Sequence, residues 1–317
     1  MEWKVESHSS TTWDEVLYVE DTTTERLGTF DVRKYTFEKK GDKKIAAFAE
    51  GHTRIAPTWA MMYLSTLSGC PVGCKMCGTV GTFVNKLSAE QMIDQIEIMM
   101  QCMTLDEADM DSLLIKWMYM GEPMLNAREY TKALRYILEK YPNWNHVIST
   151  TCPSVDFEPL YEIGRDFGDR IEFTISIHGI SELERNQVIP FQGKMTLQGA
   201  IEVGEKWFDI TGRKVSYSYN LLNSRESESE VKTLVELFDV NKWIPCIQYM
   251  HTIDEDQVDN ENRNHIEWCD AADAKVDAFM EMLRQRGYSR TQGYYTNRDE
   301  LKRGCGSLIE FQSYLKR

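Results

Sequence analysis

The sequence predicts an α/β protein built on a parallel sheet. Apolar β-type runs recur from about residue 60 onwards, a helical stretch follows each run, and no internal repeat or low-complexity tract interrupts the pattern. Near-continuous apolar runs separated by helices are typical of parallel strands. The pattern fits an open sheet or a partial barrel, and in both architectures ligands bind at the carboxyl ends of the strands.

Six segments are expected to form the strands of this sheet: residues 61–67, 113–120, 146–151, 171–177, 215–222 and 244–250. Ser88 and Gln91 have the spacing of a capping box, which predicts an amphipathic helix from there to about Met103. Further helices are predicted over residues 127–141, 195–208, 226–239 and 262–286.

The first 56 residues have a different pattern. Polar and apolar residues alternate over residues 33–38, and a second β-type run follows at residues 45–48, with Gly41-Asp42 between them. Alternation on both sides of a Gly-Asp turn predicts an antiparallel hairpin. We therefore expect residues 1–56 to be an extension with a short β-hairpin, and residues 57–317 to form one core domain.

The composition excludes several classes of protein. Of 317 residues, 42% are hydrophobic and 27% are charged, which supports a full core and excludes a disordered or fibrous chain. Apolar stretches fall far short of the ~18 residues that span a bilayer, and the first residues lack the apolar region of a signal peptide. A cytoplasmic protein without a membrane partner is expected. The net charge of −14 disfavours nonspecific nucleic-acid binding.

Three of the eight cysteines, Cys70, Cys74 and Cys77, lie within eight residues just after the first core strand. Without an export signal, they are better explained as metal ligands or catalytic thiols than as disulfides. Three thiolates in one loop can bind three irons of a [4Fe–4S] cluster and leave the fourth iron open for chemistry. The alternative is a zinc site completed by a distant ligand, although structural zinc usually uses paired cysteine or histidine groups.

The spacing C-x3-C-x2-C after the first strand resembles the radical S-adenosylmethionine (SAM) superfamily. Later motifs resemble the RlmN/Cfr family of adenine methyltransferases within that superfamily: Gly121-Glu122-Pro123, Ser149, Ser176-Ile177-His178, Val188-Ile189-Pro190 and residues 303–308. The motifs occur in the family's order, and the resemblance covers about residues 42–310. It implies a partial (β/α)6 radical SAM barrel.

The resemblance also implies two cofactors, a [4Fe–4S] cluster on the three cysteines and SAM on the open iron. The residues that it places around SAM are Gly121 and Glu122 at the amino end, and Ser149, Ser176, Ile177 and His178 along the rest of the pocket. A carboxylate is a suitable partner for the ammonium group of SAM. Taken singly, these positions also fit an ordinary turn, a helix cap and a buried histidine. Reduction of the cluster requires a flavodoxin-like or ferredoxin-like electron donor.

Cys305 lies between two glycines after the last predicted helix. In the RlmN/Cfr family the matching cysteine is methylated by one SAM, and its methyl group then loses a hydrogen atom to the radical from a second SAM. The methylene radical attacks C2 or C8 of an adenine. The resemblance therefore implies methyl transfer to an adenine of RNA or of a smaller purine-containing substrate. Flanking glycines would let the loop move between the two tasks.

The chain departs from this family at several positions. The family releases its product with a second cysteine, seven residues before the cluster, where this chain has Tyr63. Cys152 is the best-placed alternative thiol, although a packed residue after a strand is the simpler explanation. The family's general base, a glutamate in the second hairpin strand, aligns with Ala46 or Glu50 depending on the gaps. Its SAM-contacting asparagine has no clear counterpart near His251.

Basic residues near the expected active face permit a local phosphate site: Lys75, Lys86, Arg185, Lys302 and Arg303.

Three functions remain open. The first is a radical SAM methyltransferase that uses a methylated Cys305. The second is a radical SAM enzyme that abstracts hydrogen directly from a small molecule or peptide, and Tyr63 favours it. The third is a non-catalytic iron–sulfur protein, against which the retained Gly121, Glu122 and Ser149 argue. The match over residues 303–308 favours the first.

Overall fold

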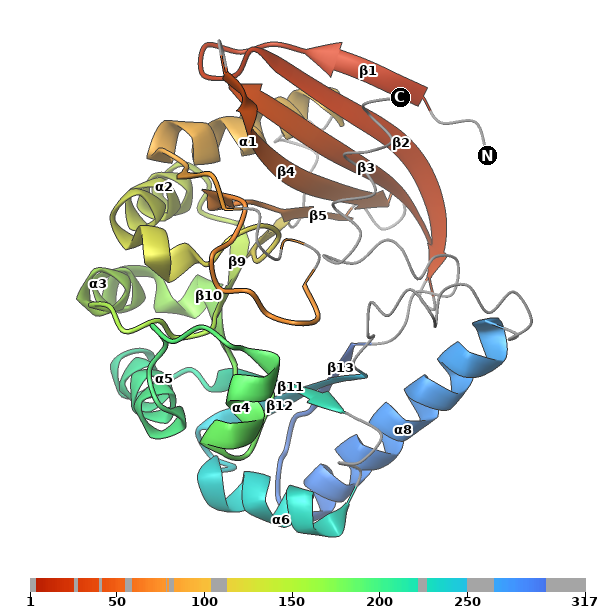
Figure 1. The fold of residues 1–317 in the computed structure, drawn as a ribbon, viewed down its shortest axis with the longest axis vertical. Helices are drawn as coiled ribbons and strands as arrows, with labels where there is room; N and C mark the ends of the chain where they lie inside the picture. The colour runs from red at the N-terminus through yellow and green to blue at the C-terminus, as the bar shows by residue number, and fades with distance from the viewer. Residues whose placement is uncertain are drawn as a thin grey trace.

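The computed structural model describes residues 4–25, 28–39, 42–54, 59–77, 79, 83–103, 113–221, 227–249 and 265–294. The strands in these ranges form one large sheet in the order β1-β2-β3-β4-β5-β8-β9-β10-β11-β12-β13, and a two-stranded sheet of β6 (Leu67–Ser68) and β7 (Asn85–Lys86). Helices α1, α2, α3 and α5 stack along one side of the curved large sheet (Figure 1).

The sheet is parallel from β5 to β13. The six predicted core strands are present as β5 (Trp59–Tyr63), β8 (Leu113–Trp117), β9 (Asn145–Thr150), β10 (Ile171–Ser176), β11 (Val215–Leu221) and β12 (Trp243–Tyr249). A short additional strand, β13 (Gln292–Tyr294), pairs with β12. The linear order of these strands agrees with a barrel that is only partial.

Helices connect the parallel strands: α1 (Ala89–Cys102), η2 (Pro123–Asn126), α2 (Ala127–Lys140), α3 (Glu158–Phe167), η3 (Gly168–Arg170), α4 (Glu182–Val188), α5 (Leu197–Thr211), α6 (Glu228–Leu237) and α8 (His265–Gln285). The predicted capping box of Ser88 and Gln91 begins α1. The short helices α3 and α4 were not predicted, because so few turns carry little periodicity. None of the described helices has the length and apolar character needed to cross a membrane.

The N-terminal extension is larger than the predicted hairpin. That hairpin corresponds to β3 (Gly28–Lys39) and β4 (Asp42–Arg54), and it is preceded by β1 (Lys4–His8) and β2 (Glu15–Glu25), all antiparallel. The polar run of β2, with three consecutive threonines, lacks the alternation that predicts a strand. Strand β4 pairs antiparallel with β5, so the extension continues the main sheet. The division at residue 56 stays a proposal.

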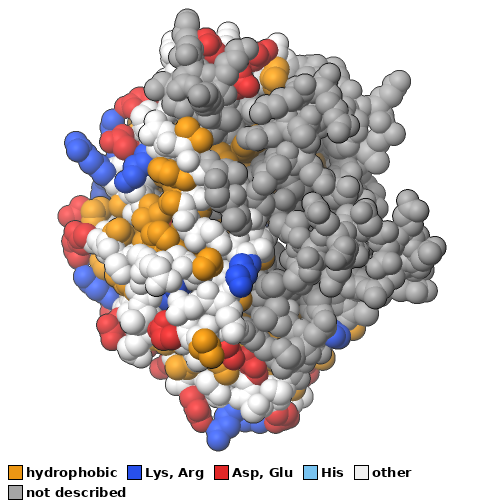
Figure 2. All heavy atoms as spheres, viewed as in Figure 1, with side chains coloured by type: hydrophobic (Ala, Val, Ile, Leu, Met, Phe, Trp, Pro, Cys, Tyr) orange, Lys and Arg blue, Asp and Glu red, His pale blue; other side chains and the backbone are white. Residues whose placement is uncertain are grey.

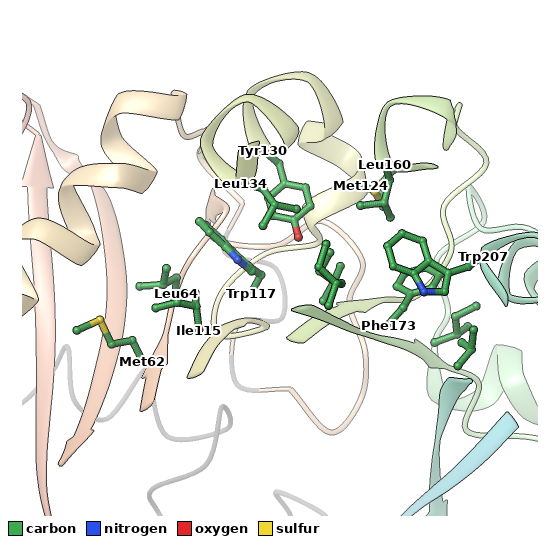
Figure 3. Close-up of a cluster of buried hydrophobic side chains, with 14 of the residues drawn as sticks. Met62, Leu64, Ile115, Trp117, Met124, Tyr130, Leu134, Leu160, Phe173 and Trp207 are labelled. Atoms are coloured by element: carbon green, nitrogen blue, oxygen red, sulfur yellow. The ribbon is translucent and has the colours of Figure 1, made fainter. Parts of the chain in front are cut away.

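Alternate residues of the parallel strands enter two different environments. On the outer face, Trp117 of β8 packs on Tyr130 of α2, and Phe173 of β10 packs on Trp207 of α5, with ring centroids 5.3 and 5.0 Å apart (Figure 3). The opposite, inner face carries buried polar side chains, each at most 9% exposed: Lys116, Thr174, Ser216, Ser218 and Asn220. Strand register pairs Thr174 with Ser216, and Ser218 and Asn220 follow at every second residue of β11 on the same face. A site at the strand ends would therefore draw on the inner face.

Candidate active site

The cysteine loop, residues 70–77, follows the carboxyl end of β5. Cys70, Cys74 and Cys77 are all partly buried, and the Cys77 amide donates to the Cys74 carbonyl oxygen at 3.0 Å. Gly73 has φ +74°, a backbone conformation that glycine adopts without strain. The loop is therefore a compact turn that presents three thiols from one short segment.

The segment after α4 supports the cysteine loop. Val188 and Ile189 form a small apolar cluster with Val72, and Cys70, Cys74 and Met76 pack against it. The Lys75 amide also donates to the Val188 carbonyl oxygen at 3.0 Å. This packing gives a structural reason for the Val188-Ile189-Pro190 motif seen in the sequence.

Electrostatic effects connect the thiols of Cys70 and Cys74 with Glu122 and with Cys77. Burial raises the pKa of the Cys70 thiol to about 12, and the charges of Glu122 and Cys77 add to the rise. Burial, then repulsion from Cys77, Cys70 and Glu122, raises the pKa of Cys74 in the same way. Thiolates in this neighbourhood need nearby positive charge. Bound iron would provide it.

The three thiols fit the requirements of a [4Fe–4S] cluster. The cysteines that hold such a cluster each bind a different iron. Cys70, Cys74 and Cys77 are partly buried and lie on one turn, which suits that arrangement. Within the described ranges, no group of three His, Cys, Asp or Glu side chains is placed to hold a single metal ion.

Glu122, just after β8, is held by four hydrogen bonds. Its Oε1 accepts from the Met124 amide at 3.1 Å and the Thr150 hydroxyl at 2.6 Å, and its Oε2 accepts from the Thr151 amide at 2.7 Å and hydroxyl at 2.9 Å. The residue is only 3% exposed. Burial raises the pKa of Glu122, and these hydrogen bonds oppose the rise. The carboxylate is thus fixed at the ends of β8 and β9, with its acceptor positions in use.

Gly121 allows two strand ends to approach closely. It has φ +103°, and a Cβ there would lie 2.7 Å from the Leu67 backbone nitrogen. The neighbouring Met120 carbonyl oxygen accepts from the Thr66 amide at 2.9 Å. These contacts tie the segment after β8 to the segment after β5. They therefore position Glu122 relative to the cysteine loop.

The other predicted SAM residues lie at the ends of β9 and β10. Ser149 pairs in register with Thr174, and Ser176 pairs with Ser218, so both serines belong to the polar rows of the sheet. The Ile177 side chain lies in the apolar core, which leaves only its backbone to meet a ligand.

His178 is 2% exposed and has φ +50°, and its amide, like that of Ile177, donates to the Ser218 carbonyl oxygen. The structure thus brings the ends of β8, β9, β10 and β11 to one edge, and the ligand roles of these residues stay predictions.

Cys152 and Arg185 are enclosed. Cys152 is 0% exposed with φ +55°, and burial raises the pKa of its thiol, which favours packing over a role as a resolving thiol. Arg185 is also 0% exposed, and its guanidinium donates to the carbonyl oxygens of Thr151 and Met195. The prediction that Arg185 contributes to a phosphate site was therefore wrong. Lys75 and Lys86 are exposed.

Four of the predicted residues, Lys302, Arg303, Cys305 and His251, lie outside the described residues.

A second polar cluster lies on the inner face beside Tyr63. We call it the Glu50–His52 cluster, and it comprises Lys34, Glu50, His52, Tyr63, Lys116 and Tyr119. Gly51 faces Met99 and Met103 beside α1, so its neighbours in β4 point to the opposite face. Glu50 pairs in register with Tyr63 at the carboxyl end of β5. The spacing Glu-x-His within a strand is the sequence signal that places both side chains together.

Comparisons with known proteins give the same family as the motifs. No protein-family model matches the chain. It is 24% identical over 254 residues to a probable dual-specificity RNA methyltransferase RlmN of Prochlorococcus marinus, covering 77% of this chain and 66% of that protein. A protein of the same name from Carboxydothermus hydrogenoformans is 26% identical over 252 residues, covering 77% and 68%. The chain is therefore similar in sequence to proteins named as RlmN-type RNA methyltransferases.

The chain spans 66% of the length of that first RlmN relative. Its fold is similar to the crystal structure of a radical SAM methyltransferase from Sphaerobacter thermophilus, with a TM-score of 0.64, 17% identity, and coverage of 90% of this chain and 79% of that one. The predicted RlmN/Cfr resemblance and the predicted partial radical SAM barrel are both confirmed.

The RlmN-type resemblance makes Tyr63 a marked departure. A tyrosine cannot form the disulfide that the resolving cysteine of the family forms. Instead, the Lys116 ammonium donates to the Tyr63 hydroxyl at 3.3 Å and lies 5.0 Å from the centre of its ring. At the position that the resemblance aligns with the second thiol, the chain has the Tyr63 phenol, and Lys116 of β8 contacts it.

Proposed function

We propose that this chain is a radical SAM methyltransferase that uses Cys305 to transfer a methyl group to C2 or C8 of an adenine, in RNA or in a smaller purine-containing substrate. The observation that carries the proposal is the turn after β5 that holds Cys70, Cys74 and Cys77, with the charge of Glu122 near enough to raise the pKa of Cys70 and Cys74. The relatives named as RNA methyltransferases support the choice of methyl transfer and of RNA. The choice of adenine rests on the resemblance of the motifs to the RlmN/Cfr family.

The residues of the site would divide the work of binding. Cys70, Cys74 and Cys77 would hold a [4Fe–4S] cluster, which supplies the electron that cleaves SAM to a 5′-deoxyadenosyl radical. Gly121 and Glu122 would meet the amino end of SAM, and Ser149 and the strand end from Ser176 through His178 would line the remainder.

Glu122 is suited to bind a cationic group. Its pKa is raised chiefly by burial, so a neighbouring ammonium would stabilise the ionised carboxylate and bring the pKa down. Thr150 and Thr151 would keep the carboxylate oriented during binding. Because four hydrogen bonds already reach its oxygens, at least one of them would be shared with the incoming ammonium.

A soluble electron donor, flavodoxin-like or ferredoxin-like, and an RNA or purine substrate are the partners that this function requires. Acidic and basic side chains are interspersed along the described part of the surface in Figure 2. The exposed Lys75 and Lys86 beside the cysteine loop offer local positive charge for an acidic donor or a phosphate. A cytoplasmic location fits these partners.

The deciding experiment is the mass of the tryptic peptide over residues 304–316, from protein produced anaerobically with ample iron. A gain of one methyl group on Cys305 is expected. The Cys305→Ala variant serves as the control, and it should cleave SAM without acquiring the methyl group. An unmodified Cys305 in protein whose cluster forms and cleaves SAM would overturn the proposal.

The second candidate, direct hydrogen abstraction from a small molecule or peptide, is favoured by Tyr63 and by the enclosure of Cys152. It predicts SAM cleavage with an unmethylated Cys305. The third candidate, a non-catalytic iron–sulfur protein, predicts no SAM binding by equilibrium dialysis.

A further inference from the structure

We propose that His52 is a general acid–base group of this site, oriented by Glu50, and that it releases the methylated product by removing a proton. The proposal rests on the proposed function and adds a proton-transfer residue to it. It assigns the task of the missing resolving cysteine to an acid–base pair next to Tyr63.

The geometry of the pair has the form of a carboxylate–histidine dyad. His52 Nε2 lies 2.6 Å from Glu50 Oε1, and the two side chains are 12% and 9% exposed. An ionised carboxylate accepts only, so Nε2 carries the proton of this bond and Nδ1 is the basic nitrogen. Within the described part of the chain, Nδ1 makes no hydrogen bond, which leaves it available to a substrate. In catalytic triads, too, one imidazole nitrogen donates a hydrogen bond to a carboxylate while the other nitrogen acts as the base.

Glu50 is better suited to orient than to accept a proton. Its burial alone would raise its pKa, but the hydrogen bond and charge of His52, the charge of Lys34 and the Tyr119 hydroxyl lower it overall. Lys34 Nζ is 3.7 Å and the Tyr119 hydroxyl 3.1 Å from Glu50 Oε2. A carboxylate with a lowered pKa is a weak base, whereas imidazole as a side chain titrates near neutral pH.

The groups around His52 also suit a planar heterocycle. The ring of Tyr63 lies 5.4 Å from that of His52, and the ring of Tyr119 lies 6.2 Å from that of Tyr63. Lys116 from β8 approaches Tyr63 on the inner face, and Lys34 from β3 approaches Glu50. Aromatic faces beside a proton acceptor can stack a purine and reach its ring carbon.

The step balances without a second cysteine. Once the methylene carbon on Cys305 has bonded to the adenine carbon, the adduct takes up one electron from the electron donor and one proton on a ring nitrogen. His52 Nδ1 then removes the proton from the bonded ring carbon. The electron pair of the broken carbon–hydrogen bond forms a double bond between the ring carbon and the methylene carbon. The carbon–sulfur bond breaks at the same time, and Cys305 leaves as a thiolate. The ring-nitrogen proton moves to the methylene carbon, which becomes the methyl group.

The test uses reconstituted enzyme with SAM, dithionite and total cellular RNA as the probe. His52→Ala should still make 5′-deoxyadenosine and methylate Cys305, but product release should slow by about 10²-fold, the usual effect of losing a general base. A covalent protein–RNA adduct should therefore accumulate. Added imidazole should restore release, because it replaces a missing base but does not repair a packing defect. After one turnover the wild-type Cys305 should be a free thiol.

Matched variants make the result decisive. His8→Gln, in β1, should behave as wild type. Adduct that accumulates in Cys152→Ala, but not in His52→Ala, would overturn the proposal in favour of a resolving thiol. If the wild-type enzyme cleaves SAM and methylates Cys305 but no RNA reacts, the proposal that RNA is the substrate is wrong. That outcome does not decide the role of His52. The dyad is then tested by nitrogen-15 NMR of the neutral His52 ring: the wild type should carry its proton on Nε2, which faces Glu50, and Glu50→Gln should lose that preference. The same tautomer in both proteins would overturn the dyad.

Discussion

The two faces of the parallel sheet are made from the same strands and serve opposite purposes. Trp117 and Lys116 are neighbours in β8, yet Trp117 packs in the outer core and Lys116 reaches Tyr63 on the inner face. Outer-face residues contribute apolar burial, which stabilises the fold. Buried polar residues on the inner face contribute less to stability, because their desolvation offsets much of what their contacts gain. Stability and chemistry are thus separated by a single residue step along each strand.

The largest expected effect comes from the site at the ends of the strands. Cys74→Ala should remove a cluster ligand, abolish the visible absorption of the reconstituted protein, and reduce SAM cleavage by at least about 10³-fold. Cys102→Ala, at the end of α1 in the outer core, is the matched control and should keep both signals. Equal losses in the two variants would break the assignment of the cysteine loop.

The next effect separates the two faces directly. Trp117→Ala should lower the free energy of unfolding by about 3–5 kcal/mol, because it empties a large buried volume. Lys116→Met keeps most of the side-chain volume, so it should change the free energy of unfolding by less than about 1.5 kcal/mol. Urea denaturation of both variants measures the difference. Similar losses would show that the inner face stabilises the fold as much as the outer face does.

A smaller effect is expected at the junction of the strand ends. Gly121→Ala should lower stability by about 1–3 kcal/mol and weaken SAM binding, since it combines an unfavourable φ with a clash against Leu67. Gly212→Ala is the control, because its φ is +68° but no atom lies within 4 Å of the added Cβ. It should lose stability without any change in SAM affinity, measured by calorimetry on the reconstituted protein. A matching loss of affinity in the control would remove Gly121 from the site.

The smallest effect concerns a charged residue buried at the start of α6. Burial, then repulsion from Glu184, raises the pKa of Glu230 from 4.5 to about 7. The folded protein therefore binds this proton more tightly than the unfolded chain, and the associated stability is lost as pH rises through 7. Glu230→Gln should be about 1–2 kcal/mol more stable than the parent at pH 8.5, after allowance for solvent screening. The difference in the free energy of unfolding between the two proteins should nearly vanish near pH 4.5. Urea denaturation at both pH values measures it.

The strands and the first helix were predictable because their signals are local. Six apolar runs and the capping box at Ser88 correspond to observed elements. The position of Glu50 required the pairing of β4 with β5, which brings residues distant in sequence together and cannot be read from either strand alone. Arg185 was misjudged for a related reason: its charge suggested a surface residue, but two backbone carbonyl oxygens satisfy it in the interior. Cys305 stays a prediction.

The antiparallel pairing of β4 with β5 joins the extension to the parallel core by a continuous hydrogen-bond ladder. Glu50 and His52 are therefore part of the same cooperative folding unit as the cysteine loop that follows β5. Amide protons of β4 should exchange with solvent as slowly as those of β5, rather than with the faster rates of an independently unfolding module. A protein cut before β4 would also expose that strand as a new edge, with the aggregation risk that unpaired edges carry.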